Sequence, residues 1–225
     1  MYNPETDPLI FKNFSVDNIE GKEFNKTELQ KYMGLPVRAD VPVIGMVTRL
    51  VKHKGLDLVK CVFEELLKAD LQFVILGSGE WEFETFFYEM AQKYPEKVGL
   101  KLGFDATLAH RIYAGSDMFL MPSKSEPCGL AQMVALRYGT VPIVRETGGL
   151  NDTITDSGNG EGNGFTFKNF NAHEMENSVW RALAGYSDKN GWDILRKRGM
   201  ACNNSWSASA GSYIGLYKEL IGHKG

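Results

Sequence analysis

Apolar and polar positions follow two regular patterns along most of the chain. Apolar runs of strand length predict six strands, near residues 43–48, 71–76, 98–103, 118–121, 141–144 and 164–167. Apolar residues at helical spacing predict helices between them, near residues 56–68, 81–93, 107–114 and 130–138. Strands that alternate with helices indicate a parallel sheet covered on both faces. We therefore expect an α/β fold, a Rossmann-like doubly wound sheet.

The two ends of the chain show other patterns. The first 40 residues are polar and irregular, with one short helix expected over residues 26–33. Beyond residue 167 the pattern is helical, in pieces near residues 172–185, 193–203 and 207–221. The expected organisation is an N-terminal segment, a Rossmann-like domain and a C-terminal helix, at residues 1–40, 41–205 and 206–225.

Composition excludes several classes of function. The chain has 225 residues, a net charge of −3 and 24% charged residues, so nothing marks it as a binder of nucleic acid or anionic membranes. No apolar run approaches the roughly 18 residues of a transmembrane helix, and the N-terminus lacks a signal-peptide pattern. Cys61, Cys128 and Cys202 are far apart, which favours reduced thiols in a cytoplasm-like compartment. No Cys or His pair has metal-ligand spacing.

The chain is organised around residues 117–130. An apolar run, Met118 to Met121, is followed by a polar turn that ends at Pro127, and then by a helical pattern. In open α/β sheets, ligands bind outside the carboxyl ends of the strands, where this turn lies. Glu126 is the one carboxylate in the turn. It either faces a ligand or only interacts favourably with the N-terminus of the helix.

Other loops at predicted strand ends contain groups that could bind an anion or a base. Arg49 and Lys54 lie in a basic loop after the first strand, which suits a diphosphate, although a solvated basic loop is the alternative. Gly148 and Gly149 follow the fifth strand, where their N–H groups could approach a phosphate closely. Phe104, after the third strand, either stacks on a base or packs in the core.

Two common nucleotide signatures are missing. The fingerprint Gly-x-Gly-x-x-Gly does not follow the first strand, and the phosphate-loop signature Gly-x-x-x-x-Gly-Lys-Ser/Thr does not occur. Hydride transfer and ATP hydrolysis are therefore disfavoured. A Gly-x-Gly turn does occur at residues 77–79, but a tight turn between a strand and a helix explains it equally well.

Three motifs carry a resemblance to a known family. They are Thr-Arg-Leu-(x)3-Lys-Gly-Leu-Asp-Leu from Thr48, Pro-Ser-(x)2-Glu-Pro-Cys-Gly-Leu from Pro122 and Thr-Gly-Gly-Leu from Thr147. In this order and spacing the chain resembles bacterial glycogen synthase and plant starch synthase. Those enzymes have the two-domain GT-B fold and transfer glucose, with retention, from ADP-glucose to the non-reducing 4-OH of an α-1,4-glucan. The likeness covers the C-terminal, nucleotide-binding half.

The resemblance also implies site residues and partners. Arg49 and Lys54 would hold the diphosphate, Phe104 would lie against the adenine, and Glu126 would bind hydroxyls of the donor glucose. Further contacts to the nucleotide sugar would come from Gly129, Leu130, Thr147, Gly148, Gly149 and Leu150. No cofactor and no metal are expected, and the partners are ADP-glucose or ADP and a glucan acceptor. The location would be the bacterial cytoplasm, or the plastid stroma for a plant protein.

Several departures from the family pattern leave alternatives open. The Lys-x-Gly-Gly-Leu loop of the family's N-terminal domain does not occur, so we interpret the chain as the C-terminal half of a synthase, not active alone. Residues 1–40 resemble the segment between the two domains of the family. The last helix resembles the family's terminal helix, which crosses back to the N-terminal domain. The position eight residues after Glu126, a ribose-binding Glu in many related enzymes, is Val134. Alternatives are a GT-B enzyme that uses a UDP-sugar, a non-catalytic nucleotide-binding module and a scaffolding domain.

Overall fold

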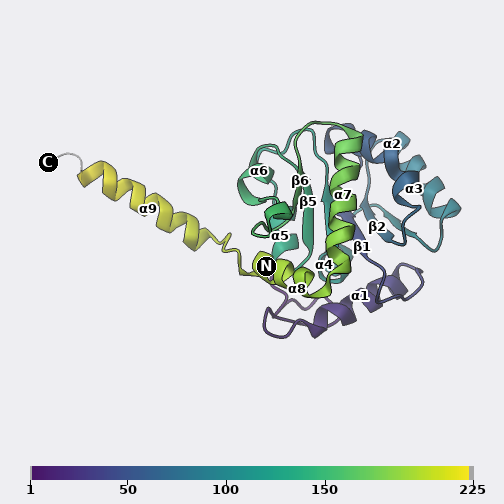
Figure 1. The fold of residues 1–225 in the computed structure, drawn as a ribbon, viewed down its shortest axis with the longest axis horizontal. Coiled ribbons are helices and arrows are strands. Elements are labelled where there is room, and N and C mark those ends of the chain that lie inside the picture. Colours follow the sequence, from purple (N-terminus) through teal and green to yellow (C-terminus); the bar gives the residue numbers. More distant parts are fainter. Residues whose placement is uncertain (1, 223–225) are drawn as a thin grey trace.

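Six parallel strands form one sheet in the computed structural model, which describes residues 2–222. The strands are β1 (Val43–Val47), β2 (Gln72–Gly77), β3 (Val98–Leu102), β4 (Met118–Met121), β5 (Val141–Arg145) and β6 (Phe165–Phe167). Their order across the sheet is β3-β2-β1-β4-β5-β6 (Figure 1). All five pairings are parallel. The predicted α/β, doubly wound sheet is confirmed, and each strand lies within a residue or two of its predicted position.

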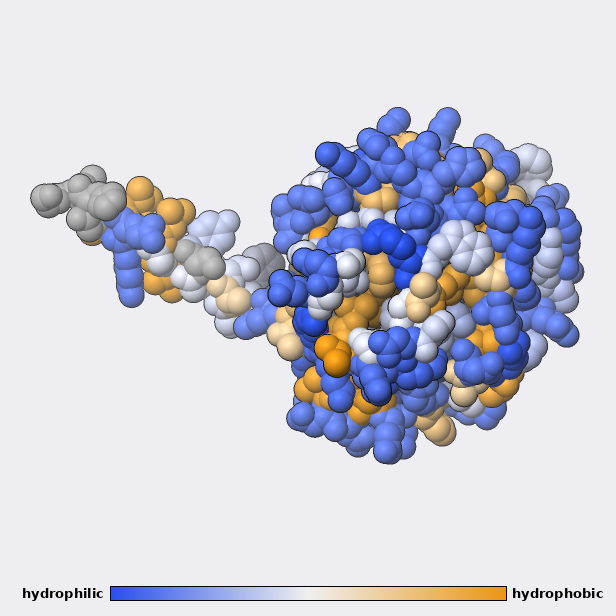
Figure 2. Space-filling view, viewed as in Figure 1, coloured by the Kyte–Doolittle hydropathy of each residue, from blue (hydrophilic) through white to orange (hydrophobic). Residues whose placement is uncertain are grey.

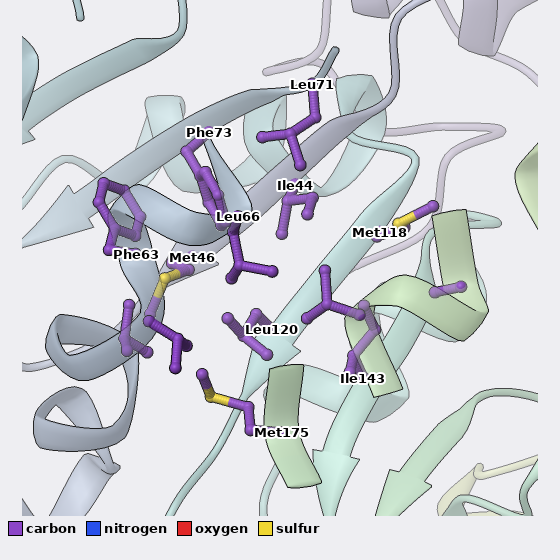
Figure 3. Packing of buried hydrophobic residues seen from close by; sticks show 14 of the residues in the cluster. Ile44, Met46, Phe63, Leu66, Leu71, Phe73, Met118, Leu120, Ile143 and Met175 are labelled. Carbon is purple, nitrogen blue, oxygen red and sulfur yellow. The ribbon is translucent and has the colours of Figure 1, made fainter. Parts of the chain in front are cut away.

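Helices cover both faces of the sheet, whereas α9 (Trp206–Gly222) projects away from it (Figure 1). The other helices are α1 (Glu20–Tyr32), α2 (Leu56–Leu66), α3 (Trp81–Lys93), α4 (Ala106–Gly115), α5 (Ala131–Arg137), α6 (Gly149–Thr153), α7 (Ala172–Ser187) and α8 (Lys189–Ala201). Side chains of α2, α3 and α7 pack against one face in a large apolar core, which Figure 3 shows around Phe63, Phe73 and Leu120. Those of α1, α4 and α5 form a second core on the other face.

The order of the strands fixes where a ligand can bind. The chain runs outward from β1 through β2 to β3, and then returns to place β4 on the other side of β1. The connections after β1 and β4 therefore diverge to opposite faces, α2 to one and α5 to the other. The gap that opens between two diverging connections is where open α/β sheets bind ligands, at the carboxyl ends of the strands.

The N-terminal segment differs from its prediction. Helix α1 begins at Glu20 rather than at residue 26, and it packs against α4 at the end of the molecule opposite the strands' carboxyl ends (Figure 1). Its buried face is mostly polar and includes Lys22, Asn25 and Lys26 at helical spacing. An apolar periodicity cannot reveal such a face, because these residue types are read as exposed. The start of the helix was therefore predicted six residues too late, whereas the rest of the described N-terminal segment is irregular, as expected.

Helix α9 leaves the body of the molecule (Figure 1). Its apolar side chains are exposed, including Tyr213, Leu216, Tyr217 and Leu220, which are 49–61% exposed. Figure 2 shows apolar residues on this projecting helix, whereas polar residues dominate much of the body in the same view. None of the helices within residues 2–222 combines the length and apolar character needed to cross a membrane.

Candidate functional site

A cavity of about 350 Å³ opens at the carboxyl ends of β1 and β4. Its walls come from the end of β1 and the loop after it, from the end of β4 and the turn after it, and from the start of α5. The lining residues that also belong to the predicted site are Arg49, Lys54, Glu126, Gly129 and Leu130. The cavity therefore lies at the point where the order of strands reverses, and it brings together predicted site residues from Arg49 to Leu130.

Close backbone packing holds the two loops of this cavity together. Gly55 has φ 76°, and a Cβ atom there would lie 2.0 Å from the carbonyl oxygen of Pro122. Only glycine fits both the left-handed conformation and the contact. The N–H of Lys124 also donates to the carbonyl oxygen of His53, at 2.9 Å. These contacts fix the basic loop after β1 against the turn after β4.

Lys54 and Glu126 form an ion pair inside the cavity. Lys54 Nζ lies 2.6 Å from Glu126 Oε2, and the two side chains are 19% and 14% exposed. The hydroxyl of Ser123 donates to the same carboxylate oxygen, at 3.2 Å. Arg49 is exposed beside His53, with 3.4 Å between Nη2 and Nε2. The site thus offers two cations and one carboxylate, and its carboxylate neutralises one of those cations.

Gly148 and Gly149 form a turn after β5, the glycine turn. It packs against the back of the turn after β4 that contains Glu126 and Cys128, the Glu126 turn. The N–H of Gly149 lies 3.2 Å from the carbonyl oxygen of Glu126. A Cβ atom at Gly149 would lie 1.9 Å from the carbonyl oxygen of Cys128, and one at Gly148 (φ 46°) would lie 2.3 Å from that of Glu126. Neither position can therefore take a larger residue unless the Glu126 turn moves. The two glycines support the cavity without lining it.

The other predicted site residues lie in different surroundings. Phe104 is 93% exposed at the start of α4, beyond β2 from the cavity, so it does not pack in the core. Leu130 is 68% exposed on the cavity wall. The Leu150 side chain is buried, so any contact from this residue to a ligand would come from its main chain. Thr147 is half-buried, and its carbonyl oxygen accepts from the N–H of Leu150.

Sequence reasoning missed two residues that shape the cavity. Ser123 contacts Glu126, and it stands three positions before it in the same motif, which was a usable signal. Arg145 at the end of β5 donates to the carbonyl oxygens of Ser123 and Lys124 and so fixes the start of the turn. Nothing in the sequence distinguishes Arg145 from a surface arginine. Within residues 2–222, no group of three or more His, Cys, Asp or Glu residues could hold a metal ion.

Comparison with known proteins gives the chain a family. Residues 34–193 match the family described as Glycosyl transferases group 1. The chain belongs to this family. Its resemblance to glycogen synthases is confirmed by relatives in Bacillus anthracis and Anoxybacillus flavithermus, both named glycogen synthase, at 56% identity over 223 residues and 54% over 227. These alignments cover 98% and 100% of this chain but 47% of each relative. This glycosyl transferase chain therefore spans about half the length of the curated relatives it matches.

A solved structure shows the same fold. The catalytic domain of starch synthase IV from Arabidopsis thaliana, bound to ADP and acarbose, matches with a TM-score of 0.89 and 38% sequence identity. The match covers 97% of this chain and 46% of that chain. The expected fold, one Rossmann-like half of a GT-B glycosyl transferase, is confirmed.

Proposed function

We propose that this chain is the donor-binding half of a retaining glucosyltransferase, which transfers glucose from ADP-glucose to the non-reducing 4-OH of an α-1,4-glucan. One observation carries the proposal. A cavity lined by Arg49, Lys54 and Glu126 opens at the β1–β4 switch point of a chain that matches an ADP-bound starch synthase domain with a TM-score of 0.89. Relatives named glycogen synthase support the same reaction.

The two cations would bind the diphosphate and stabilise the charge that it gains. When the glucose leaves as an oxocarbenium-like species, negative charge grows on the diphosphate. Arg49 and Lys54 stand on a loop whose main chain is packed against Pro122 at Gly55, so the loop itself needs little rearrangement as that charge develops. In a closed, dry site, the loss of one such fixed donor typically costs about 2.7–4 kcal/mol of transition-state stabilisation.

Glu126 would then bind hydroxyls of the donor glucose. Before the ligand arrives, its carboxylate is paired with Lys54 at 2.6 Å. A diphosphate that draws Lys54 toward itself loosens this pair and leaves a carboxylate oxygen able to accept from a sugar hydroxyl. Ser123 stays beside the carboxylate throughout, because it belongs to the same turn. Arrival of the diphosphate and binding of the sugar are therefore coupled through one ion pair.

The base would lie at the β3 end of the site, against Phe104. Stacking on an aromatic ring is worth roughly 1–3 kcal/mol per base and tolerates any base, so contacts to the adenine edge must supply selectivity. The test is calorimetric titration of the chain with ADP, UDP and ADP-glucose. We expect ADP to bind more tightly than UDP, and ADP-glucose to bind as well. Equal affinities, or tighter UDP, would favour a UDP-sugar enzyme. No binding at all would favour a scaffolding domain and refute the proposal.

Transfer should require the other half of the enzyme. In a GT-B enzyme the acceptor is held in the cleft between two domains, and the orientation it gains there can reach about 7–11 kcal/mol. Helix α9, with exposed Tyr213, Tyr217 and Leu220, is the element that we expect to pack against the N-terminal domain. We expect no incorporation of labelled glucose into glycogen by this chain alone, and incorporation when a separately made N-terminal half is added. Efficient transfer by the chain alone would contradict the assignment; no transfer by the mixture would favour a non-catalytic module.

A further inference from the structure

A buried amide joins the Glu126 turn to the glycine turn. Gln132, at the start of α5, is fully buried, although nothing in the proposed reaction uses it directly. Its Nε2 lies 3.2 Å from the carbonyl oxygen of Cys128 and 2.9 Å from that of Gly129. The same nitrogen lies 3.1 Å from Thr153 Oγ1, on α6. One side chain therefore contacts both loops behind the cavity.

The contact continues into the glycine turn. The hydroxyl of Thr153 accepts from Gln132, and it donates to the carbonyl oxygen of Gly149 at 2.6 Å. On the other side, the N–H of Gly149 lies 3.2 Å from the carbonyl oxygen of Glu126. The hydrogen bonds thus form a closed ring from Gln132 through Thr153 and Gly149 to the main chain of the Glu126 turn, and back through Cys128.

The surroundings of the amide require a donor at this position. Three oxygens face Nε2, whereas Oε1 is buried without a hydrogen-bond partner among the described residues. An interchange of the two amide atoms would turn an oxygen toward the carbonyl oxygens of Cys128 and Gly129, which can only accept. A Cβ atom at Gly129 (φ 68°) would lie 2.5 Å from Oε1, so the turn closes directly over the amide. Packing alone would be satisfied by Leu or Met, which leave no unpaired buried oxygen.

We propose that Gln132 is a positioning residue for donor binding, which fixes the Glu126 turn relative to the glycine turn and so holds Glu126 where the sugar arrives. The inference rests on the proposed function. It assigns Gln132 no contact with the substrate, because Gln132 does not line the cavity. Its effect is on the main chain of Cys128 and Gly129, which follow Glu126 directly.

The first test compares two buried glutamines. Gln132→Met keeps the length of the side chain and removes its donors. Gln30→Met is the matched control, since Gln30 is also fully buried but donates to Arg38 and Gln72, far from the cavity on α1. By calorimetry, we expect Gln132→Met to weaken ADP-glucose about tenfold and ADP less, and Gln30→Met to change neither. Equal losses in both variants, or a loss under about twofold in Gln132→Met, would overturn the proposal.

A second test separates hydrogen bonding from packing through pH. In Gln132→Glu, a carboxylate would face three oxygens, so its pKa should rise and only the protonated acid can donate. Affinity of this variant for ADP-glucose should fall as the pH increases from about 5 to about 8, beyond any change in the parent. Glu126 and Cys128, which lie in the adjoining turn, are the same in both proteins, so comparison with the parent corrects for any contribution from them. A pH profile parallel to that of the parent would overturn the proposal.

A third measurement does not depend on any ligand. Hydrogen exchange at the amide of Gly149, which donates to the Glu126 turn, should accelerate in Gln132→Met and stay unchanged in Gln30→Met. If the parent failed to bind ADP-glucose, the proposed function would be refuted. The exchange experiment would still test whether Gln132 holds the two turns together. Unchanged exchange at Gly149 in Gln132→Met would show that the amide does not hold the two turns together.

Discussion

Two lysine–carboxylate pairs lie at opposite ends of the same two strands, and their surroundings differ. At the amino ends of β1 and β4, Lys26 Nζ lies 2.8 Å from Asp117 Oδ2, with side chains only 2% and 5% exposed. At the carboxyl ends, Lys54 and Glu126 are 2.6 Å apart, with 19% and 14% exposed. The distances are similar, so the difference lies in what else each charge can contact.

The amino-end pair is satisfied entirely by the protein. Lys26 also donates to the carbonyl oxygen of Ala39 and to the hydroxyl of Tyr186, and Asp117 accepts from the N–H of Val43. Close by, Lys22 donates to carbonyl oxygens at the ends of α4 and α5, which favour a cation. Burial lowers the pKa of Lys22 to about 7, although the charge of Asp117 opposes the shift. These groups can exchange partners only if this end of the molecule unfolds.

The carboxyl-end pair faces a cavity of about 350 Å³. Lys54 has Glu126 as its hydrogen-bond partner there, and a diphosphate in the cavity could replace it. Burial, rather than the presence of an ion pair, therefore separates a structural lysine from one available to a ligand.

The largest effect should come from breaking the buried pair. Asp117→Asn leaves the Lys26 ammonium buried without a compensating charge, and removal of one partner of a buried pair typically costs about 3–5 kcal/mol. Glu126→Gln removes the corresponding partner at the carboxyl end, where partial exposure should limit the loss to about 1 kcal/mol. Urea unfolding of both variants measures the difference. Similar losses in the two variants would show that the two ends are not distinct.

A smaller effect is expected where the glycine turn packs on the Glu126 turn. Gly149→Ala places a Cβ atom 1.9 Å from the carbonyl oxygen of Cys128, so the turn must shift. Overpacking of this kind costs about 1–3 kcal/mol. We expect that loss in urea unfolding, together with weaker binding of ADP-glucose. Gly211→Ala on α9, where nothing lies within 4 Å of the added atom, is the control and should not lower stability.

Much of the fold followed from the sequence, because apolar runs and helical spacing report burial directly. Met118–Met121 and Trp81–Lys93 were predicted with the bounds that the structure has. Helix α1 was predicted too short, because its buried face is mostly polar and includes Lys22, Asn25, Lys26 and Gln30. The hydrogen-bond partners of buried Lys22, for example, lie more than 80 positions away in the chain. No local sequence pattern encodes such partners.

The candidate site could be predicted only in part. Arg49, Lys54 and Glu126 were found because charged residues at strand ends are informative, and the structure gathers them around one cavity. Their roles as diphosphate and sugar ligands remain predictions. The Lys54–Glu126 pair was not foreseen, because each residue was considered alone. Gln132 was missed since a single glutamine in a helical pattern carries no signal until its neighbours in space are known.

The central claim is that a diphosphate replaces Glu126 as the partner of Lys54. It is tested most directly by titrating ADP and ADP-glucose into the parent chain, Arg49→Ala and Glu126→Gln side by side. Because Glu126 neutralises Lys54 before the ligand binds, Glu126→Gln should leave ADP affinity unchanged or raise it up to about fivefold, roughly 1 kcal/mol, and should remove the advantage that glucose adds. Arg49→Ala should weaken both ligands together. If Glu126→Gln weakened ADP as much as Arg49→Ala does, Glu126 would not be a competitor for Lys54, and its assignment to the sugar would be wrong.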